Sequence, residues 1–347
     1  MKIDIYTHIQ PRKYLDELLK VVETHHKHLL TRFRVIESTR SLWNLDERFR
    51  VMDKYEDLVQ VLVPTGPPVE LLAQPKDVTR LVKLYNDEIA ELVQKHPDRF
   101  IAGVACLPLN DVDAALGEAQ RAITGLGFKG ILVDSPIYDY SSEKTKPIDL
   151  PEYMPLYEMM STYDLPIWIH PRRESSVSDY TTEKESKYFI FHCFGWPYET
   201  TVAMARLVFS GILETFPALK LITHHCGAMI PFLADRIERL YGYMWAHGQK
   251  GFMEKLSRPP IEYFKQFYND TALYGNTAGL MCGNAFFGID HLLFGTDMPY
   301  DAEQGDEFTR ETIQAIVQMN ISDLEKEKIF KDNALDLLNL RKGKSNP

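Results

Sequence analysis

The sequence of 347 residues lacks any long apolar run. No stretch approaches the roughly 18 consecutive apolar residues that a transmembrane helix needs, and the chain begins with the strand-like segment Lys2–Ile5 rather than the apolar stretch of a signal peptide. Positive charge is also scarce, because the formal net charge is −10 and no dense run of Lys or Arg occurs. This balance argues against a nucleic-acid partner. We therefore expect a soluble protein without a membrane partner.

Cysteine is scarce too. The four cysteines lie far apart in the chain, and no two of them form a C-x-x-C pair. Clustered cysteines would indicate a disulfide framework or a structural zinc site. Their absence favours reduced thiols and a cytoplasmic protein. The four residues are Cys106, Cys193, Cys226 and Cys282.

A Gly-rich phosphate turn after an early strand is absent as well, which disfavours a doubly wound open sheet. Instead, eight short β-prone runs occur, most of them separated by helical patterns. Apolar runs that alternate with helices are typical of parallel sheets, and eight of them predict a closed α/β barrel of the (β/α)8 TIM type. The predicted strands span residues 3–7, 58–63, 100–107, 128–133, 165–170, 219–224, 267–270 and 291–296, and two predicted helices span 77–95 and 111–124.

The whole chain, 1–347, is predicted to form one such barrel domain. Hydrophobic residues make up 45% of the sequence and aromatic residues 12%, which is enough to form a large core. The segment from residue 12 to about residue 50 is long and rich in charged residues. We interpret it as an insertion that distorts the barrel after its first strand. The segments 135–150 and 171–188 follow strands at their carboxyl ends, where barrels build active sites, and are candidate walls of a substrate pocket.

Three predicted strands end in a residue that can bind a metal ion. Ile3-Asp4-Ile5-Tyr6-Thr7-His8, Trp168-Ile169-His170-Pro171 and Phe294-Gly295-Thr296-Asp297 supply two imidazoles and a carboxylate. A parallel barrel gathers the carboxyl ends of its strands around one mouth. Catalytic zinc sites use about three such ligands and keep one position open. We therefore expect His8, His170 and Asp297 to share one ion.

A fourth candidate lies at the end of the run 219–224, in Thr223-His224-His225-Cys226-Gly227. A neutral imidazole there could act as a general base or orient a metal-bound water. Successive side chains of a regular strand point to opposite faces, so only one of His224 and His225 is expected to face the site. Geometry alone does not say which one.

Arginines are candidates for binding a substrate carboxylate, because the guanidinium group offers a bidentate fork. Arg48 lies in Trp43-Asn44-Leu45-Asp46-Glu47-Arg48, and Arg172 and Arg173 directly follow His170-Pro171. Arg172 and Arg173 are better placed than Arg48, because they directly follow a predicted strand end, but the sequence does not say in which direction their side chains point.

These motifs resemble the decarboxylase branch of the amidohydrolase superfamily, which includes aminocarboxymuconate semialdehyde decarboxylase and γ-resorcylate decarboxylase. The resemblance covers almost the whole chain. Beyond the strand ends named above, it rests on Met1–Ile5 with Pro11, Trp43 through Asp53, Gly195-Trp196-Pro197 through Thr201, His225 through Gly227, Pro231-Phe232, Met298-Pro299 and Asn333-Ala334-Leu335.

The resemblance implies one divalent metal ion at the mouth of a distorted barrel, held by His8, His170 and Asp297. We expect zinc, with manganese as the alternative. His225 matches the histidine that this family associates with the metal-bound water or the substrate, and it is therefore preferred over His224.

The same resemblance places Arg48 at a substrate-carboxylate arginine and His192 at an active-site aromatic residue. Tyr6 and Arg172 are further candidates for contact with the substrate. It also implies a homodimer or a larger homo-oligomer.

Tyr6 departs from the family pattern, which has histidine or glutamate at this position. A neutral phenol is a poor ligand, and its ionisation is costly unless a metal supplies the gain. Tyr6 could bind as a phenolate, or stand aside while the other three ligands hold the ion, or mark a site that has lost its metal. We favour the second alternative, because three ligands suffice.

The function that follows is a metal-dependent, non-oxidative decarboxylase (a carboxy-lyase) acting on a small unsaturated or aromatic carboxylic acid. Loss of CO2 leaves electron density on carbon, so the site must neutralise charge and supply a proton, which Asp297 or His225 could deliver. A metal-dependent hydrolase or hydratase of the same superfamily is the alternative, with His225 assisting the attack of water. A metal-free binding protein is a third hypothesis, which rests on Tyr6 alone.

Overall fold

The computed structural model describes residues 1–25, 30–139, 144–249, 251 and 253–341. Within this part of the chain, parallel strands lie in all eight of the predicted runs. They form one sheet in the order β1-β2-β3 and another in the order β10-β9-β8-β7-β4. These strands are β1 (Lys2–Ile9), β2 (Leu58–Pro64), β3 (Phe100–Gly103), β4 (Ile131–Ser135), β7 (Ile167–Pro171), β8 (Leu221–Thr223), β9 (Tyr268–Asp270) and β10 (Leu292–Leu293).

The two sheets touch at both of their sides. After β3, Ala105 forms a parallel bridge with Ile131 of β4. On the opposite side, the segment after β10 pairs with β1: the Ile5 amide donates to the Phe294 carbonyl at 2.9 Å, and the Asp297 amide donates to the Tyr6 carbonyl at 3.0 Å. This second seam places Asp297 next to the middle of β1.

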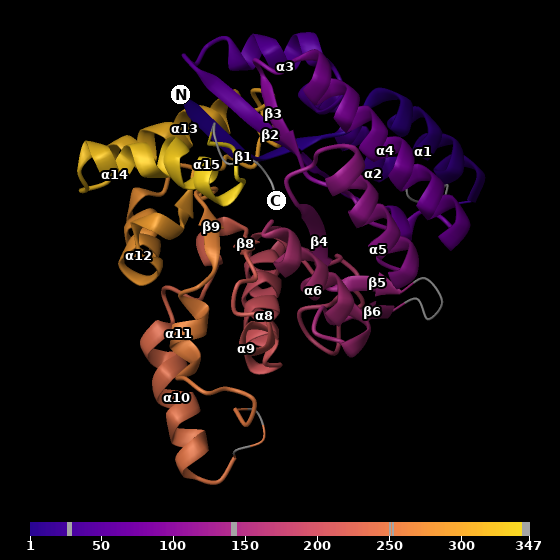
Figure 1. Ribbon diagram of the computed structural model, residues 1–347. Helices are drawn as coiled ribbons and strands as arrows, with labels where there is room; N and C mark the ends of the chain where they lie inside the picture. Colours follow the sequence, from indigo (N-terminus) through magenta and orange to yellow (C-terminus); the bar gives the residue numbers. More distant parts are fainter. Residues whose placement is uncertain (26–29, 140–143, 250, 252, 342–347) are drawn as a thin grey trace.

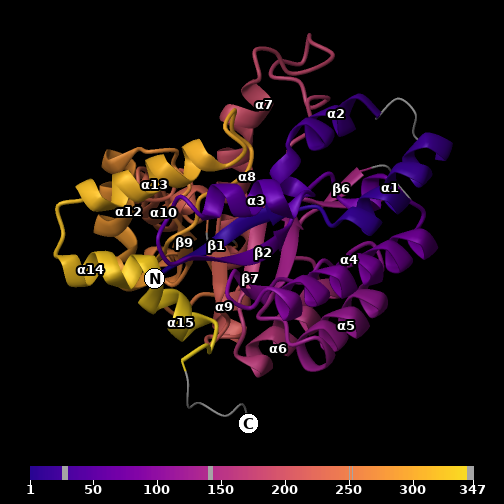
Figure 2. The ribbon, with the colours of Figure 1, turned by 90° about the horizontal axis from the view of Figure 1, so that it is seen from above.

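Helices surround the strands (Figure 1), and α10 and α11 extend away from the rest of the chain. Seen from above, α2, α7 and the loop before α7 lie on one side of the molecule, and α6, α9 and α15 lie on the other (Figure 2). The α-helices are α1 (Arg12–His25), α2 (Leu30–Ser38), α3 (Leu45–Met52), α4 (Pro75–Lys95), α5 (Val112–Gln120), α6 (Met154–Tyr163), α7 (Ile190–Cys193), α8 (Gly195–Phe209), α9 (Ile212–Thr215), α10 (Ala234–Ala246), α11 (Pro260–Phe264), α12 (Thr277–Phe287), α13 (Asp306–Gln318), α14 (Asp323–Glu327) and α15 (Asn333–Leu337).

The longest helix shows why these segments fold as they do. In α4, Pro75 occupies the first turn, where its missing N–H costs nothing. Val78, Leu81, Val82 and Tyr85 recur at helical spacing and are buried. The predicted helix 77–95 is thereby confirmed, and α5 lies inside the predicted range 111–124, with Asp111 capping its first turn.

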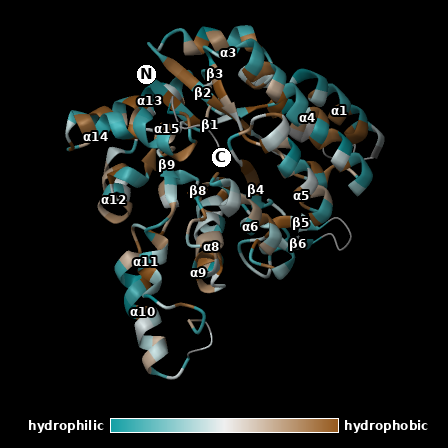
Figure 3. Ribbon diagram, viewed as in Figure 1, coloured by the Kyte–Doolittle hydropathy of each residue, from teal (hydrophilic) through white to brown (hydrophobic). Residues whose placement is uncertain are grey.

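The core has two layers, one on each face of the strands. Apolar side chains from different strands fill the space between the two sheets, among them Ile5, Val61, Trp168, Ile222 and Leu293. A larger cluster packs the outer faces of the strands against the helices. In Figure 3 the strands in the centre carry the hydrophobic colours and the outer helices carry most of the hydrophilic ones. The functional side chains therefore have to come from strand ends and loops.

Two segments that were set apart from the regular alternation contain helices or strands. The described residues of the predicted insertion, 12 to about 50, include α1, α2 and most of α3, and α1 is tied to α4 where the Tyr14 amide donates to Glu88 Oε2 at 2.6 Å. The loop 135–150 contains a hairpin, β5 (Ile137–Asp139) with β6 (Lys144–Lys146), while residues 140–143 lie outside the described part. Among the described residues, no helix combines the length and apolar character needed to cross a membrane.

Candidate active site

The three predicted metal ligands meet at the carboxyl ends of their strands. His8 comes from β1, His170 from β7 and Asp297 from the loop after β10, and all three are buried. His8 Nε2 lies 3.1 Å from Asp297 Oδ1. One ring nitrogen from each of His8, His170 and His224 lies within 4.8 Å of the others, which is slightly more than twice a metal–nitrogen bond of about 2.1 Å.

An oxygen atom lies close to Nδ1 of each of these three imidazoles, although Nδ1 of His170 forms no hydrogen bond with it. His8 Nδ1 lies 2.8 Å from the carbonyl of Pro64, and because a carbonyl only accepts, this nitrogen carries the proton. His224 Nδ1 pairs with Asp270 Oδ2, and His170 Nδ1 lies 3.4 Å from Asp134 Oδ1. Metal-binding histidines characteristically donate their second nitrogen in this way, which directs Nε2 to the ion.

His224 Nε2 is the second imidazole nitrogen close to Asp297 Oδ1, at 3.2 Å. Burial alone would lower the pKa of His224, but the carboxylates of Asp270 and Asp297 raise it to about 10. Burial likewise would raise the pKa of Asp297, and the neighbouring His224 and His8 hold it well below its usual range. The centre therefore carries a carboxylate that attracts positive charge.

Both histidines of the pair at the end of β8 face this centre, which contradicts the expectation that His224 points elsewhere. The strand ends at Thr223, and His225 and Cys226 have φ values of 55° and 53°. The alternation of a strand does not apply to such a turn. The rings of His224 and His225 lie 3.8 Å apart, and His225 Nε2 is 3.9 Å from Asp297 Oδ2.

Tyr6 forms a wall of the site. Its ring is fully buried and stacks on His224, with 4.0 Å between ring centroids and an interplanar angle of 4°. Its hydroxyl lies 3.4 Å from the Ile169 carbonyl. Burial, together with the charges of Asp270 and Asp297, raises the pKa of Tyr6 far above its ordinary value. The phenol is therefore neutral, and ionisation to phenolate is disfavoured.

Arg48 does not face the substrate site, and the prediction that it binds a substrate carboxylate is wrong. The side chain is fully buried. Its Nε donates to Gln60 Oε1 at 2.7 Å, Nη1 to the carbonyls of His8 at 2.8 Å and Ser41 at 3.2 Å, and Nη2 to Thr7 Oγ1 at 2.8 Å. Thr7 alternates with His8 along β1, so these contacts lie on the opposite face of the strand. Arg48 fastens α3 to β1 and β2.

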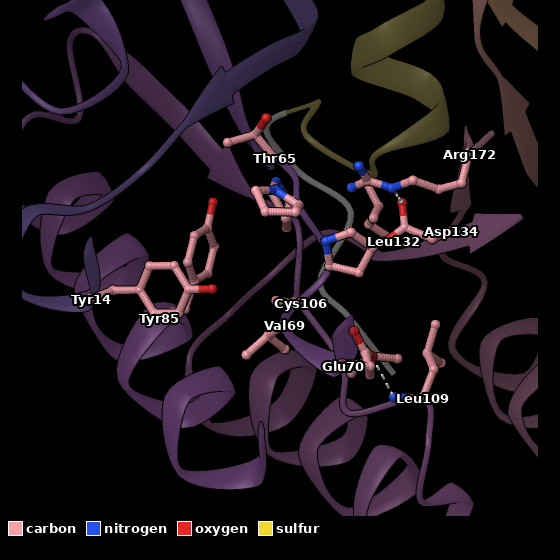
Figure 4. Close-up of a pocket in the computed structure, with 14 residues that line it drawn as sticks. Tyr14, Thr65, Val69, Glu70, Tyr85, Cys106, Leu109, Leu132, Asp134 and Arg172 are labelled. Carbon is pink, nitrogen blue, oxygen red and sulfur yellow. Dashed lines mark hydrogen bonds and ion pairs between the residues drawn. The ribbon is translucent and has the colours of Figure 1, made fainter. Parts of the chain in front are cut away.

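Arg172 lies closer to the site. Its Nε donates to Asp134 Oδ1 at 2.9 Å, and the two side chains point toward each other in Figure 4. Burial would raise the pKa of Asp134, but Arg172 and His170 lower it to about 2. The neighbouring Arg173 turns to Glu199, at 2.9 Å. Arg172 and Asp134 thus form a charged pair next to His170.

Two cavities meet at Arg172. The smaller, drawn in Figure 4, has a volume of about 20 Å³ and is also lined by Glu70, Tyr85 and Asp134. The larger has a volume of about 430 Å³ and lies between the β5–β6 hairpin and the loop after β7, the two predicted pocket walls. It is large enough for a small aromatic acid. Arg172, which follows β7 two residues after His170, is among its lining residues, whereas His170 itself and Asp297 are not.

Aromatic side chains surround the centre. His192 packs on Trp196 at 4.1 Å, and Trp196 lies 5.4 Å from the ring of His170. Burial lowers the pKa of His192. The Tyr300 ring lies 5.6 Å from His8, and the Tyr274 hydroxyl donates to Asp297 Oδ2 at 2.7 Å.

Several of these residues were not predicted. Asp134 follows the run 128–133 directly, so the strand-end criterion that found His170 could have found it. Tyr274 and Tyr300 lie in loops, and no local sequence pattern marks them.

Comparison with known proteins supports the family resemblance. The profile of the amidohydrolase family matches residues 22–340. The γ-resorcylate decarboxylase of Polaromonas sp. is 29% identical over 299 residues, which cover 86% of this chain and 88% of that protein. The 2-amino-3-carboxymuconate-6-semialdehyde decarboxylase of Dictyostelium discoideum is 27% identical, covering 98% of this chain and 92% of that one.

A solved structure gives the same result. The dihydroxybenzoic acid decarboxylase of Polaromonas sp., crystallised with manganese and the inhibitor 2-nitroresorcinol, superimposes with a TM-score of 0.76 at 26% identity. The match covers 98% of this chain and 97% of that chain. The chain therefore belongs to the amidohydrolase family, and the prediction of a decarboxylase, a carboxy-lyase, is confirmed.

Proposed function

We propose that this decarboxylase uses one divalent metal ion, held by His8, His170 and Asp297, to act on a small aromatic carboxylic acid. The observation that carries the proposal is the convergence of His8 Nε2 and His224 Nε2 on Asp297 Oδ1, at 3.1 and 3.2 Å, with Nδ1 of each ring held by a carbonyl or carboxylate oxygen. One ring nitrogen of His170 lies within 4.8 Å of one nitrogen from each of these two rings. Among the described residues, His224 Nε2 is moreover buried without a hydrogen bond. Such an orphaned nitrogen beside a carboxylate is suited to a cation.

The donor set also bears on which ion is bound. Imidazole and carboxylate ligands together are typical of zinc, and we propose zinc as the resident ion. The relative from Polaromonas sp. was crystallised with manganese, which makes manganese the second candidate. When bound, either ion would orient the substrate carboxylate and neutralise charge as the carbon–carbon bond breaks.

His225 and Asp297 are the proposed routes for the proton that replaces CO2 on carbon. Burial and the charge of His224 lower the pKa of His225 well below its ordinary value, so its imidazole is neutral and can accept and pass on a proton. The hydroxyl of Tyr274 lies 3.3 Å from His225 Nε2 and donates to Asp297. Tyr274 therefore orients both groups.

The substrate class follows from the surroundings of the centre and from the relatives. His192, Trp196 and Tyr300 offer aromatic faces, against which an aromatic ring can stack. Arg172 is the proposed partner for a second acidic group of the substrate, because its guanidinium has donors beyond the Nε that pairs with Asp134. The relatives point to a hydroxylated benzoate, since one was crystallised with 2,6-dihydroxybenzoate.

The test is turnover in heavy water. The purified enzyme, with its metal content measured by elemental analysis, is incubated with 2,6-dihydroxybenzoate and related hydroxybenzoates. One CO2 per substrate consumed, with deuterium at the carbon that lost the carboxyl group, is the expected result. Incorporation of ¹⁸O from labelled water into the product, without CO2, would instead indicate hydrolysis and overturn the proposal.

We also propose a single (β/α)8 barrel domain over 1–347, with α1 and α2 as an insertion after β1. The contacts at both sides of the two sheets support closure into a barrel. A homodimer is proposed as well, supported by the apolar residues that α10 exposes where it extends from the molecule (Figure 1): Leu240, Tyr243, Met244 and Trp245. Light scattering on the purified protein tests the dimer.

A further inference from the structure

We propose that His224 is a fourth metal ligand that replaces the ligand lost at position 6, so that the ion is held by His8, His170, His224 and Asp297. The inference rests on the proposed function, in that it assumes a bound divalent ion. It assigns a role to a histidine that the family motif does not use and explains how the chain tolerates Tyr6.

The first argument is the central place of His224. Within the described residues, two groups of side chains could hold a metal ion: His8 with His170 and His224, and His224 with His225 and Asp297. His224 is common to both. Its Nε2 and that of His8 approach the same oxygen, Asp297 Oδ1, at 3.2 and 3.1 Å. Both nitrogens thus converge on the oxygen atom that a shared cation would also bind.

The second argument is the support behind the ring. His224 Nδ1 pairs with Asp270 Oδ2, while Asp270 Oδ1 accepts from the amides of Cys226 at 3.2 Å and Ala272 at 3.0 Å. The carboxylate is thus held in place by the backbone and in turn fixes the imidazole. This carboxylate–histidine arrangement is the one that orients metal ligands in proteins. His224 is therefore presented to the centre as a built ligand.

The third argument is the position of Tyr6. Its ring lies flat on one side of His224, and its hydroxyl is directed to the Ile169 carbonyl rather than to the shared oxygen of Asp297. The backbone of Gly295 packs closely against Tyr6, since a Cβ atom added at Gly295 would lie 3.2 Å from the Tyr6 Cβ. Tyr6 acts as a stacking support, and the imidazole that it supports takes over coordination.

The experiment measures zinc affinity by competition with a chelator, together with metal content, for wild type, His224→Asn, and the double variant Tyr6→His/His224→Asn. We expect His224→Asn to weaken zinc binding at least 100-fold and the double variant to recover most of it, because a ligand returns at position 6. His291→Asn is the control, because His291 lies outside both groups and its Nδ1 pairs with the Phe267 carbonyl at 3.1 Å, so its loss should leave zinc affinity within a few-fold of wild type.

The outcomes separate the two proposals. A wild-type protein that binds neither zinc nor manganese overturns the proposed function itself. Wild-type zinc affinity in a folded His224→Asn protein overturns only the role of His224. A measurement that needs no variant is a crystal structure of the zinc-loaded wild type: His224 Nε2 at about 2.0–2.1 Å from the ion is expected, and a separation beyond bonding distance refutes the inference.

Discussion

Arg48 provides the sharpest test of the difference between the family motif and the structure. Replacing it with Met keeps much of the side-chain volume but removes every donor. The acceptors on Gln60, His8, Ser41 and Thr7 would then lose their partner inside the protein. Each buried acceptor left without a partner costs about 1–3 kcal/mol, and because such costs do not add fully, about 3–5 kcal/mol is expected in total. We therefore expect the free energy of unfolding to fall by about that amount.

The size of this effect follows from the environment of the guanidinium. Burial lowers the pKa of Arg48 to about 10 while Asp4 acts in the opposite direction, so the group stays charged at neutral pH. Its hydrogen bonds go to neutral acceptors, and each such bond to a charged donor contributes roughly 1.5–3 kcal/mol. These contributions do not add fully. We therefore expect the free energy of unfolding to fall by an amount near the middle of the range given above.

The assay is urea denaturation followed by circular dichroism, with Arg50→Met as the matched control. Arg50 lies on the same helix, α3, but is exposed, and within the described part of the chain it pairs only with Glu47, so its replacement should change stability little. Steady-state kinetics far below the unfolding transition should show nearly unchanged KM for Arg48→Met. A variant with wild-type stability and a KM raised 100-fold would mean that Arg48 binds substrate, and the structural argument would be refuted.

Further predictions concern the groups around the centre. Tyr274→Phe removes a hydrogen bond to the Asp297 carboxylate, and kcat/KM should fall about 10- to 100-fold while the urea midpoint stays near wild type. Asp134→Asn weakens the hold on His170 Nδ1, and zinc affinity measured against a chelator should fall roughly 10- to 100-fold. Burial raises the pKa of Glu70 from 4.5 to about 7, so its folded form binds the proton more tightly and stability falls as pH rises from about 4.5 to 7. Glu70→Gln should remove this contribution, and its stability relative to wild type should increase by about 3 kcal/mol between pH 4 and pH 8 in urea titrations.

The fold could be predicted from the sequence because its signal is repeated. Most of the eight strands are short apolar runs, because burial on both faces makes such runs continuous rather than alternating, whereas β9 (Tyr268–Asp270) is polar. The predicted ends of the strands agree less well with the structure. The run 291–296 contains only a two-residue strand, Leu292–Leu293, because the residues that follow it pair irregularly with β1. The segment between β1 and β2 is predicted only as a charged insertion, yet α1 buries the apolar residues Leu15, Leu18 and Val22 on one face.

The candidate site was predictable only where a strand ends in a ligand. His8, His170 and Asp297 were found by that rule, and Asp134 fits the same rule. Arg48 was assigned through its spacing from Trp43, and spacing does not report which face of β1 a guanidinium reaches. The buried Arg48 side chain is hydrogen-bonded to Gln60 and Ser41. A single sequence does not show that these residues are in contact with Arg48.

The histidine pair shows the physical limit of reading chemistry from periodicity. The rule that one of two consecutive side chains points away holds only while the backbone is extended. His225 and Cys226 leave the strand with positive φ, as does Asp297 with φ 64°. These are sparsely populated conformations for residues other than glycine, and such strain concentrates at functional sites. The turn brings the rings of His224 and His225 into one centre, and the ring of Tyr6 stacks on His224 there. The alternation of side chains therefore fails at the residue pair that most needs it, because the position of His224 depends on a change of backbone conformation that no local sequence pattern reports.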